Sequence, residues 1–149
     1  MPVDVVRDDF DAVEARLGLA ADATLEDVAQ VAQRIARARV RVDTRDLQNS
    51  IEVHRIGPQT YTLEAGEAHG VYNEFGTGIY FDASSFAAAG GAPGATGRQT
   101  PWVYRHPRYG FITTRGMSPQ PYMAPAAEES RLALRPAALA NFKEFRRRG

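Results

Sequence analysis

The chain has 149 residues, the length of one domain whose core needs no help from a metal or a disulfide. It contains no cysteine, which excludes disulfide frameworks, thiolate metal sites, iron–sulfur clusters and a cysteine nucleophile. Eighteen basic and eighteen acidic residues give a net charge of zero, so any attraction to nucleic acid or to a membrane must be local.

Two helices are predicted in the N-terminal third. Apolar residues recur at helical spacing over residues 5–17, between Asp4, placed to cap, and Gly18, placed to stop. From Thr24 the spacing resumes and predicts a second helix, with acidic residues in its first turn. Its apolar stripe consists of Leu25, Val28, Ala29, Ala32, Ile35 and Ala36.

This second helix ends in a run of arginines. They suit the negative end of the helix dipole, and we interpret them as solvated side chains. The alternative is a phosphate-binding patch, which would make the chain a nucleic-acid-binding module. The arginines are Arg34, Arg37, Arg39 and Arg41.

The middle of the chain predicts two β hairpins. Residues 51–65 alternate between apolar and polar around Gly57-Pro58-Gln59, which is typical of a hairpin with one solvated face. Residues 102–115 are rich in aromatic and β-branched residues on both sides of a turn at 106–110. Between the hairpins, residues 78–97 hold five glycines, six alanines and a single charged residue, so we expect a mobile loop without regular structure.

A long helix is predicted over residues 122–148, with Glu128 and Glu129 near its start and arginines at its end. Pro136 should kink or split it, because proline lacks the N–H that a helix interior needs. The side chains expected to be buried are Met123, Ala127, Leu134, Leu139, Phe142 and Phe145. Together these elements predict an α+β fold: N-terminal helices, a small antiparallel sheet and a long C-terminal helix packed on the sheet.

We expect a single domain over residues 1–149. Residues 1–23 would form an N-terminal helical extension, and residues 78–118 a projecting insertion made of the flexible loop and the second hairpin. The first ten residues lack an apolar run, and no apolar stretch of 18 residues occurs, so neither a secretory signal nor a membrane span is expected.

Catalytic chemistry has little support in the sequence. The three histidines lack the spacing that places two imidazoles on one metal, and no serine lies in a GxSxG turn. We therefore expect no catalytic residue, no cofactor and no metal. The alternative is a small hydrolase or transferase that uses Glu64, Glu67, Glu74 or His69, although three glutamates this close are more often a solvated face.

Two short motifs point to a family. Residues 71–77 read VYNEFGT, and residues 119–126 read PQPYMAPA at the entrance to the last helix; residues 42–51 add a partial match at Thr44, Leu47 and Ser50. In this order the motifs resemble the tail-completion or neck proteins of long-tailed phages, the gene-product-ten-like proteins of lambdoid phages. The motif residues are Tyr72, Glu74, Phe75, Gly76, Thr77, Pro119, Gln120, Pro121, Tyr122 and Pro125.

The motifs also have a physical interpretation. Gly76 can adopt a positive φ and end a short helical turn that directs Phe75 inward. The prolines stiffen the approach to the last helix and place Pro125 or a neighbour in its first turn. This glycine and these prolines fix the direction in which the chain passes from one element to the next, either within the fold or at an interface.

The resemblance implies a non-enzymatic structural protein of the virion, assembled in the host cytoplasm. It would be a ring subunit of the neck, with six-fold symmetry, between the head connector or head-completion proteins and the tail terminator or tail tube. Genome DNA would pass through the ring without sequence-specific binding. The interface would be made by aromatic anchors of the second hairpin, foremost Trp102, Tyr104 and Phe111, with Tyr109.

Overall fold

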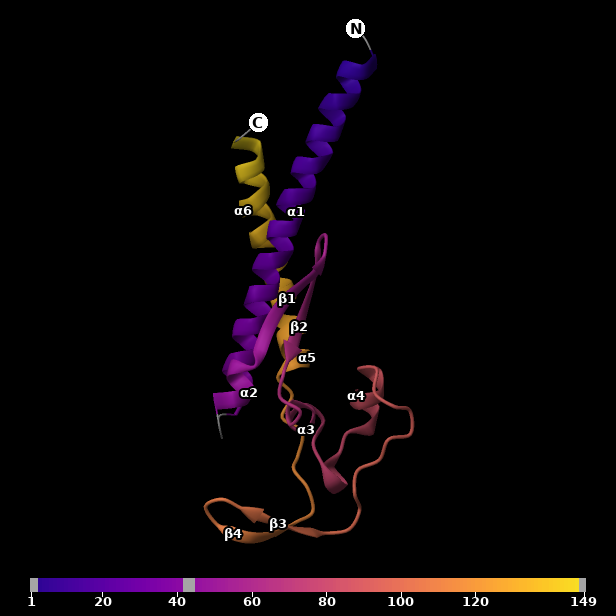
Figure 1. Cartoon of the computed structure of the whole chain (residues 1–149), viewed down its shortest axis with the longest axis vertical. Helices are drawn as coiled ribbons and strands as arrows, with labels where there is room; N and C mark the ends of the chain where they lie inside the picture. Colours follow the sequence, from indigo (N-terminus) through magenta and orange to yellow (C-terminus); the bar gives the residue numbers. More distant parts are fainter. Residues whose placement is uncertain (1–2, 42–44, 148–149) are drawn as a thin grey trace.

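The computed structural model describes residues 3–41 and 45–147 of the chain, and side chains from residue 11 onward. It has the predicted α+β composition, in an elongated shape with the start of α1 at one end and a β hairpin at the other (Figure 1). The elements are α1 Val3–Arg39, α2 Arg45–Asn49, β1 Ile51–Gly57, β2 Thr60–Ala65, α3 Gly70–Phe75, the 3₁₀ turn η1 Gly78–Tyr80, α4 Ala83–Ala88, β3 Trp102–His106, β4 Gly110–Thr114, α5 Met123–Ser130, the 3₁₀ turn η2 Arg131–Ala133 and α6 Leu134–Arg147.

The two N-terminal helices predicted from the sequence are one continuous helix, α1. Asp4 lies inside it, Gly18 does not end it, and the Thr24 hydroxyl donates to the Ala20 carbonyl at 2.7 Å instead of capping a new helix. A mid-helix glycine costs about 1 kcal/mol relative to alanine. Packing offsets that cost, because the Gln59 side chain of the β1–β2 tip lies against Gly18 and α6 packs along the same stretch.

The first hairpin forms as predicted and lies along α1. β1 and β2 pair antiparallel, with Ile51 opposite Ala65 and a register shift between Arg55 and Gly57. Asp22 of α1 holds the hairpin tip, since its carboxylate accepts from the Gln59 backbone N–H at 2.8 Å and from the Tyr61 hydroxyl at 3.2 Å. These contacts, led by the one from Gln59, lower the pKa of Asp22.

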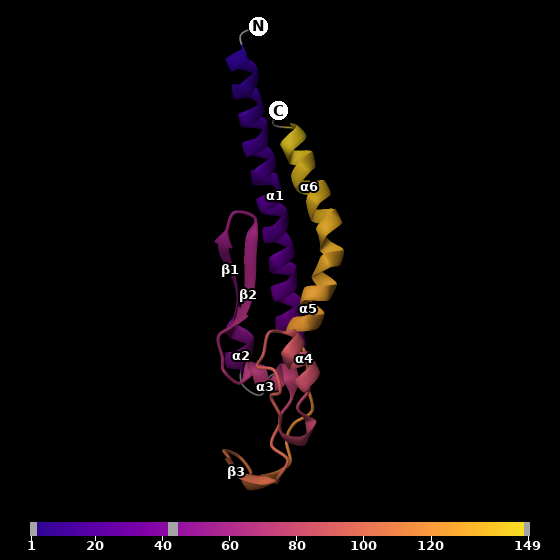
Figure 2. The same cartoon turned by 90° about the vertical axis from the view of Figure 1, so that its right-hand side faces the viewer.

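The C-terminal segment is split as predicted, but it packs on α1 and not on the sheet. Figure 2 shows α5 and α6 along one side of α1 and the β1–β2 hairpin along another. The break is η2, and Pro136 lies in the first turn of α6, where its missing N–H leaves no helical bond unmade.

The predicted buried stripe of this segment is only partly right. Met123, Phe142 and Phe145 are half-buried, whereas Ala127, Leu134 and Leu139 are exposed. For Leu134 and Leu139 the physical reason is the 3₁₀ turn before them, which has about 3.0 residues per turn and rotates the following helix relative to a continuous one. Ala127 precedes this turn and lies beside the face of α5 that buries Ala126 and Ser130.

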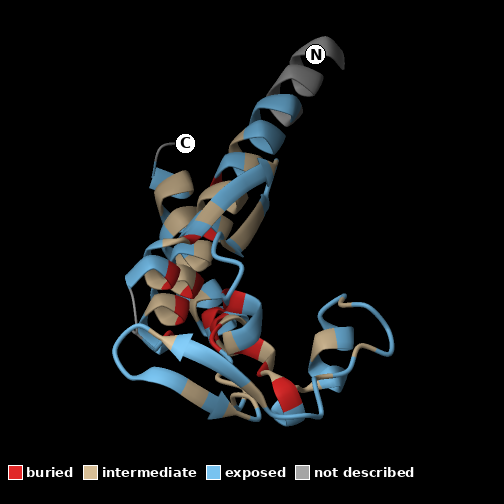
Figure 3. Ribbon diagram, turned by 60° about the horizontal axis from the view of Figure 1, so that its bottom comes forward, coloured by how far each residue is buried: buried red, intermediate tan, exposed pale blue. Residues whose placement is uncertain are grey.

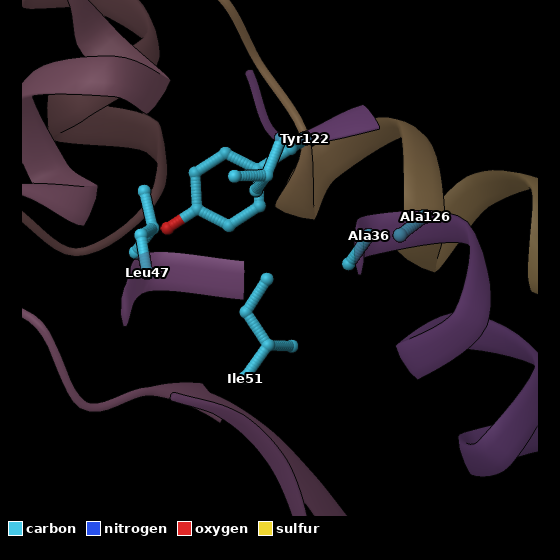
Figure 4. Close-up of a cluster of buried hydrophobic side chains, with 6 residues drawn as sticks. Ala36, Leu47, Ile51, Tyr122 and Ala126 are labelled. Atoms are coloured by element: carbon cyan, nitrogen blue, oxygen red, sulfur yellow. The ribbon is translucent and has the colours of Figure 1, made fainter. Parts of the chain in front are cut away.

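The core lies where α1, α2, β1 and α5 meet, near the middle of the molecule (Figure 3). Ala36 of α1 and Ala126 of α5 are fully buried, so the two helix backbones approach closely. In Figure 4 the Tyr122 ring reaches from the start of α5 toward Leu47 and Ile51. Thus Leu47 and Tyr122, both from the sequence motifs, are core residues; Thr44 lies outside the described residues.

Residues 78–97 are not the structureless loop that composition suggested, since they contain η1 and α4. Asp82 caps α4 by accepting from the backbone N–H groups of Ser84 and Ser85 at 3.2 and 3.1 Å. Phe86 packs edge-on against Phe75 with ring centroids 5.3 Å apart. A cap and an aromatic pair therefore give this glycine- and alanine-rich segment local structure.

The capping of α4 predicts an acid-sensitive carboxylate. Hydrogen bonds from Ser85, then from Ser84, lower the pKa of Asp82 to about 2. A folded-state pKa below the unfolded 3.8 means that the stabilisation is fully present above pH 3.8 and is lost as pH falls through about 2. We expect carbon-13 NMR to show Asp82 titrating near pH 2, and Ser85→Ala to raise that value. Titration near 3.8 in the unaltered chain would contradict the cap.

The second hairpin, β3–β4, forms as predicted at the far end of the molecule (Figure 1). We call residues 101–115 the arm. At its base the Ile79 N–H donates to the Arg115 carbonyl at 3.0 Å, and Gly116, with φ of 128°, lies so close to the Thr77 carbonyl that a Cβ there would overlap it. The arm is thereby attached to the chain next to the VYNEFGT motif.

Candidate functional site

The two sequence motifs meet in space through Glu74. This side chain is only 8% exposed and points from α3 at the start of α5, 48 residues away. Its carboxylate accepts from the backbone N–H groups of Tyr122, Met123 and Ala124 at 2.7, 2.9 and 3.0 Å. The first N–H groups of a helix have no partner within it and form the positive end of its dipole. Glu74 therefore caps α5 from a distant part of the chain.

Glu74 takes the place of the usual N-cap side chain of α5, because Tyr122 at the N-cap position makes no capping hydrogen bond through its side chain. The interpretation of the glutamates as one solvated face is therefore wrong for Glu74, while Glu64 and Glu67 are exposed as expected. A buried carboxylate usually suggests acid–base chemistry. Here both carboxylate oxygens of Glu74 accept hydrogen bonds from backbone N–H groups, which is typical of a structural role.

Backbone contacts extend the junction along both motifs. The Gln120 N–H donates to the Asn73 carbonyl at 2.7 Å, and the Thr77 N–H donates to the Met117 carbonyl at 2.8 Å. In return the Met117 N–H donates to the Thr77 hydroxyl oxygen at 3.0 Å. The two motifs thus run side by side over several residues, as a single structural unit that we call the motif junction: residues 70–77 and 117–126.

Gly76 behaves as its position in the motif predicts. It follows the last residue of α3 with a φ of 75°, in the region that favours glycine. A Cβ on Gly76 would lie 2.7 Å from the Met117 carbonyl oxygen and 2.8 Å from the Cδ of Pro119. Both the conformation and the space therefore require glycine where the second motif crosses the first.

Tyr122 completes the junction from inside. Burial and, to a smaller extent, the charge of Glu74 raise the pKa of its hydroxyl to about 12, so the ring is neutral at physiological pH. A Cβ added to Gly70 would lie 2.6 Å from that hydroxyl oxygen and 3.1 Å from Leu47. The ring therefore fills the space between α2 and α3, and its role here is packing.

The remaining motif residues divide between the inside and the surface. Phe75 and Pro125 are half-buried, and Pro125 lies in the first turn of α5 as expected. Tyr72 and Pro121 are exposed. These two side chains are accessible to another molecule.

The arm places its aromatic residues on two different faces. Tyr104 lies opposite Ile112 and Arg105 opposite Phe111, and side chains alternate along a strand. Trp102 and Tyr104 therefore share a face, on which Arg98 stacks 5.4 Å from the Trp102 ring and Tyr104 lies 6.4 Å from the ring of His106. Trp102 is half-buried there, whereas Tyr104 is exposed.

The opposite face of the hairpin is exposed throughout. We call it the arm face: Val103, Arg105, Phe111 and Thr113. Phe111 is 79% exposed and Val103 is 60% exposed. The sequence reasoning named Phe111 but missed Val103, although the alternation of the hairpin places Val103 on the same face.

The residues of the alternative hydrolase are not brought together. His69 is exposed, 3.7 Å from the equally exposed Glu67, and Glu74 is buried in the motif junction. An open groove of about 790 Å³ lies between α1 and β1, and neither these residues nor Glu64 line it. Among the residues that the structure describes, no group of three or more potential metal ligands is found. The described helices include none that is long and apolar enough to cross a membrane.

The arginines at the end of α1 are partly used inside the fold. Arg37 donates through Nε and Nη2 to the Ile51 carbonyl at 3.1 and 2.8 Å, and Arg39 pairs with Glu129 of α5. Arg34 and Arg41 are exposed. Interpreting all four as solvated side chains was therefore wrong for Arg37, and the set does not form one open basic patch.

Arg37 should contribute measurably to stability, because it holds β1 against α1. We expect Arg37→Ala to lower the free energy of unfolding by about 1–2 kcal/mol, less than the full value of a hydrogen bond from a charged donor, because the Gln33 side chain also donates to the Ile51 carbonyl, at 3.0 Å. The matched control Arg34→Ala, at an exposed position of the same helix, should change it by less than about 0.5 kcal/mol. Urea unfolding measures both. Equal effects would show that the contact to Ile51 contributes nothing.

Comparison with known proteins gives one match. Residues 4–76, from the start of α1 to the end of the first motif, match the family model described as "Bacteriophage HK97-gp10, putative tail-component". Searches of curated proteins and of solved structures found no significant match. The match ends at Gly76, so the PQPYMAPA motif, the arm and the C-terminal helices lie beyond it.

Proposed function

We propose that the chain is a phage tail component of the HK97-gp10-like family, which its match over residues 4–76 supports, and that it is a ring subunit of the neck, which joins head and tail. As a tail component it is a structural protein of the virion. The finer role rests on the resemblance of both motifs to tail-completion proteins and on the shape of the subunit.

The observation that carries the proposal is the arm. A hairpin at one end of the molecule exposes Val103, Tyr109 and Phe111 to solvent. A protein that works alone gains little from such a cluster, whereas a subunit of an assembly can bury it against a neighbour, where aromatic anchors contribute most of the affinity. The motif junction fixes the base of the arm, so the arm is presented in a defined direction.

In this proposal the whole chain, residues 1–149, acts as one unit, and residues 78–118 are its projecting insertion. The partners are further copies of the chain, a head connector or head-completion protein on one side, and the tail terminator or tail tube on the other. Genome DNA passes through the ring without sequence-specific binding. The protein has no catalytic role, and its assembly begins in the host cytoplasm.

Two measurements test the proposal. Sedimentation velocity and negative-stain imaging of the purified chain should show closed rings, alone or with its neck partners, and removal of the gene from its phage should leave full heads and free tails unjoined. Joined, infectious particles without the gene would overturn it. The alternative enzyme would be revealed by a turnover that is lost in Glu64→Ala or His69→Ala while the fold is retained.

A further inference from the structure

The arm and the segment before it carry positive charge and no carboxylate. None of the eighteen acidic residues of the chain lies in residues 83–127, which contain four arginines: Arg98, Arg105, Arg108 and Arg115. None of these arginines forms an ion pair with another residue that the structure describes. The nearest preceding carboxylate, that of Asp82, is engaged in the cap of α4. This end of the molecule therefore favours an anionic partner (Figure 1).

Aromatic rings form a row on the side of the arm opposite the arm face. The alternation of β3 places Trp102, Tyr104 and His106 on that side. The ring centroids of Tyr104 and His106 lie 6.4 Å apart, and the Tyr109 ring lies 4.7 Å from that of His106. We call these residues the stacking row: Trp102, Tyr104, His106 and Tyr109. Tyr104 and Tyr109 are 42% and 66% exposed, so a flat group of another molecule can reach them.

A guanidinium group lies at each end of the stacking row. Arg98 is 5.4 Å from the ring centroid of Trp102, and Arg108 is 5.6 Å from that of Tyr109. Both arginines are exposed. The Nε of Arg98 donates to the Thr100 hydroxyl oxygen at 3.2 Å, which leaves its terminal nitrogens without a partner among the described residues. Rings flanked by such donors match a ligand that has both flat groups and phosphates.

We infer that the stacking row binds a single strand of DNA without sequence preference. Bases of the strand stack on Tyr104 and Tyr109, and every base has the flat face that stacking needs. The guanidinium groups of Arg98 and Arg108 pair with its phosphates. Only the identity of the strand as DNA rests on the proposed neck, through which the genome passes, since binding to the row requires no ring. The arm face stays available to a neighbouring protein.

Two other anionic partners match only part of this surface. A DNA duplex offers phosphates to the arginines, but its bases are paired and stacked in its interior, where the rings of the row do not reach them. An acidic peptide would pair with the arginines but brings no regular series of flat groups for the rings. A single strand presents phosphates and unpaired bases together, so it uses both features of the arm.

Trp102 reports binding at the row, because it is the only tryptophan of the chain. The full-length chain is titrated, at about 0.15 M salt, with an end-labelled oligothymidylate. The strand has about twenty nucleotides, more than the roughly 4–16 that one single-strand-binding domain covers. We expect the Trp102 fluorescence to be quenched and the anisotropy of the label to rise with the same midpoint. The same strand annealed to its complement should bind at least about tenfold more weakly.

Variants separate stacking from charge alone. Tyr104→Leu removes the ring but keeps an apolar residue on the strand, and should weaken binding roughly tenfold, whereas Tyr104→Phe should bind within about twofold of the unaltered chain. Arg108→Ala should weaken binding and lower the slope of log affinity against log salt concentration by about 0.7. Arg105→Ala removes the same charge from the arm face and should have less than about a threefold effect. An unchanged emission maximum of Trp102 shows that the arm is retained in each variant.

Several results would overturn this assignment. Equal losses in Arg105→Ala and Arg108→Ala would reduce it to a diffuse effect of charge. A duplex bound as tightly as the single strand would assign the arm to the phosphate backbone, oligoglutamate that displaces the strand would assign it to an acidic protein, and tighter binding of oligouridylate would assign it to RNA. Strand binding by a chain that forms no ring, alone or with its neck partners, would support the stacking row and overturn the neck ring. Rings that bind no strand would do the reverse.

Discussion

Replacing Glu74 by alanine is expected to lower the free energy of unfolding by about 3 kcal/mol. Three backbone N–H groups at the start of α5 lose their acceptor, and an unsatisfied buried donor costs about 1–3 kcal/mol. The expected loss is smaller than three times the cost of one unsatisfied donor, because the N–H groups of Met123 and Ala124 are only part-buried and water can reach them in the variant. Chemical denaturation with circular dichroism detection measures the loss.

Two further variants make this prediction specific. Glu74→Gln retains one acceptor oxygen without the charge and should lose about half as much. Glu67→Ala, at an exposed glutamate close by in the sequence, should change stability by less than about 0.5 kcal/mol. A Glu74→Ala chain as stable as the Glu67→Ala chain would show that the carboxylate does not hold the two motifs together.

Gly76→Ala is expected to cost about 3 kcal/mol. A left-handed backbone costs a residue with a side chain about 1–2 kcal/mol, and overpacking adds about 1–3 kcal/mol. Both apply at Gly76, whose φ is 75° and whose added methyl group would press on Met117 and Pro119. Thermal or urea unfolding would report the loss.

Gly94 supplies the control, because its φ is 76° and nothing lies within 4 Å of an added Cβ. Gly94→Ala therefore carries the backbone cost alone, about 1 kcal/mol. The difference between the two variants measures the packing of one motif on the other. If they lost the same stability, the close approach at Gly76 would have no energetic consequence.

Local sequence patterns determined most of the elements of this protein. The alternation of residues 51–65 predicted the first hairpin, and the aromatic and β-branched residues on both sides of the turn at 106–110 predicted the second. Pro136 predicted an interruption of the last helix, and the glycine of VYNEFGT predicted a positive φ. Each signal acts within a few residues, where backbone sterics dominate.

The tertiary structure decided how those elements are used. Gly18 predicted a helix end, but α1 continues through that position, where the hairpin tip and α6 pack on it. The sequence could not assign Glu74, because its partners lie 48 to 50 residues away and only the fold brings them within hydrogen-bond reach. The contacts of Arg37 and Asp22 were not predicted for the same reason. From the sequence alone a charged side chain is expected to be solvated, because the distant carbonyl or amide that it binds is not known.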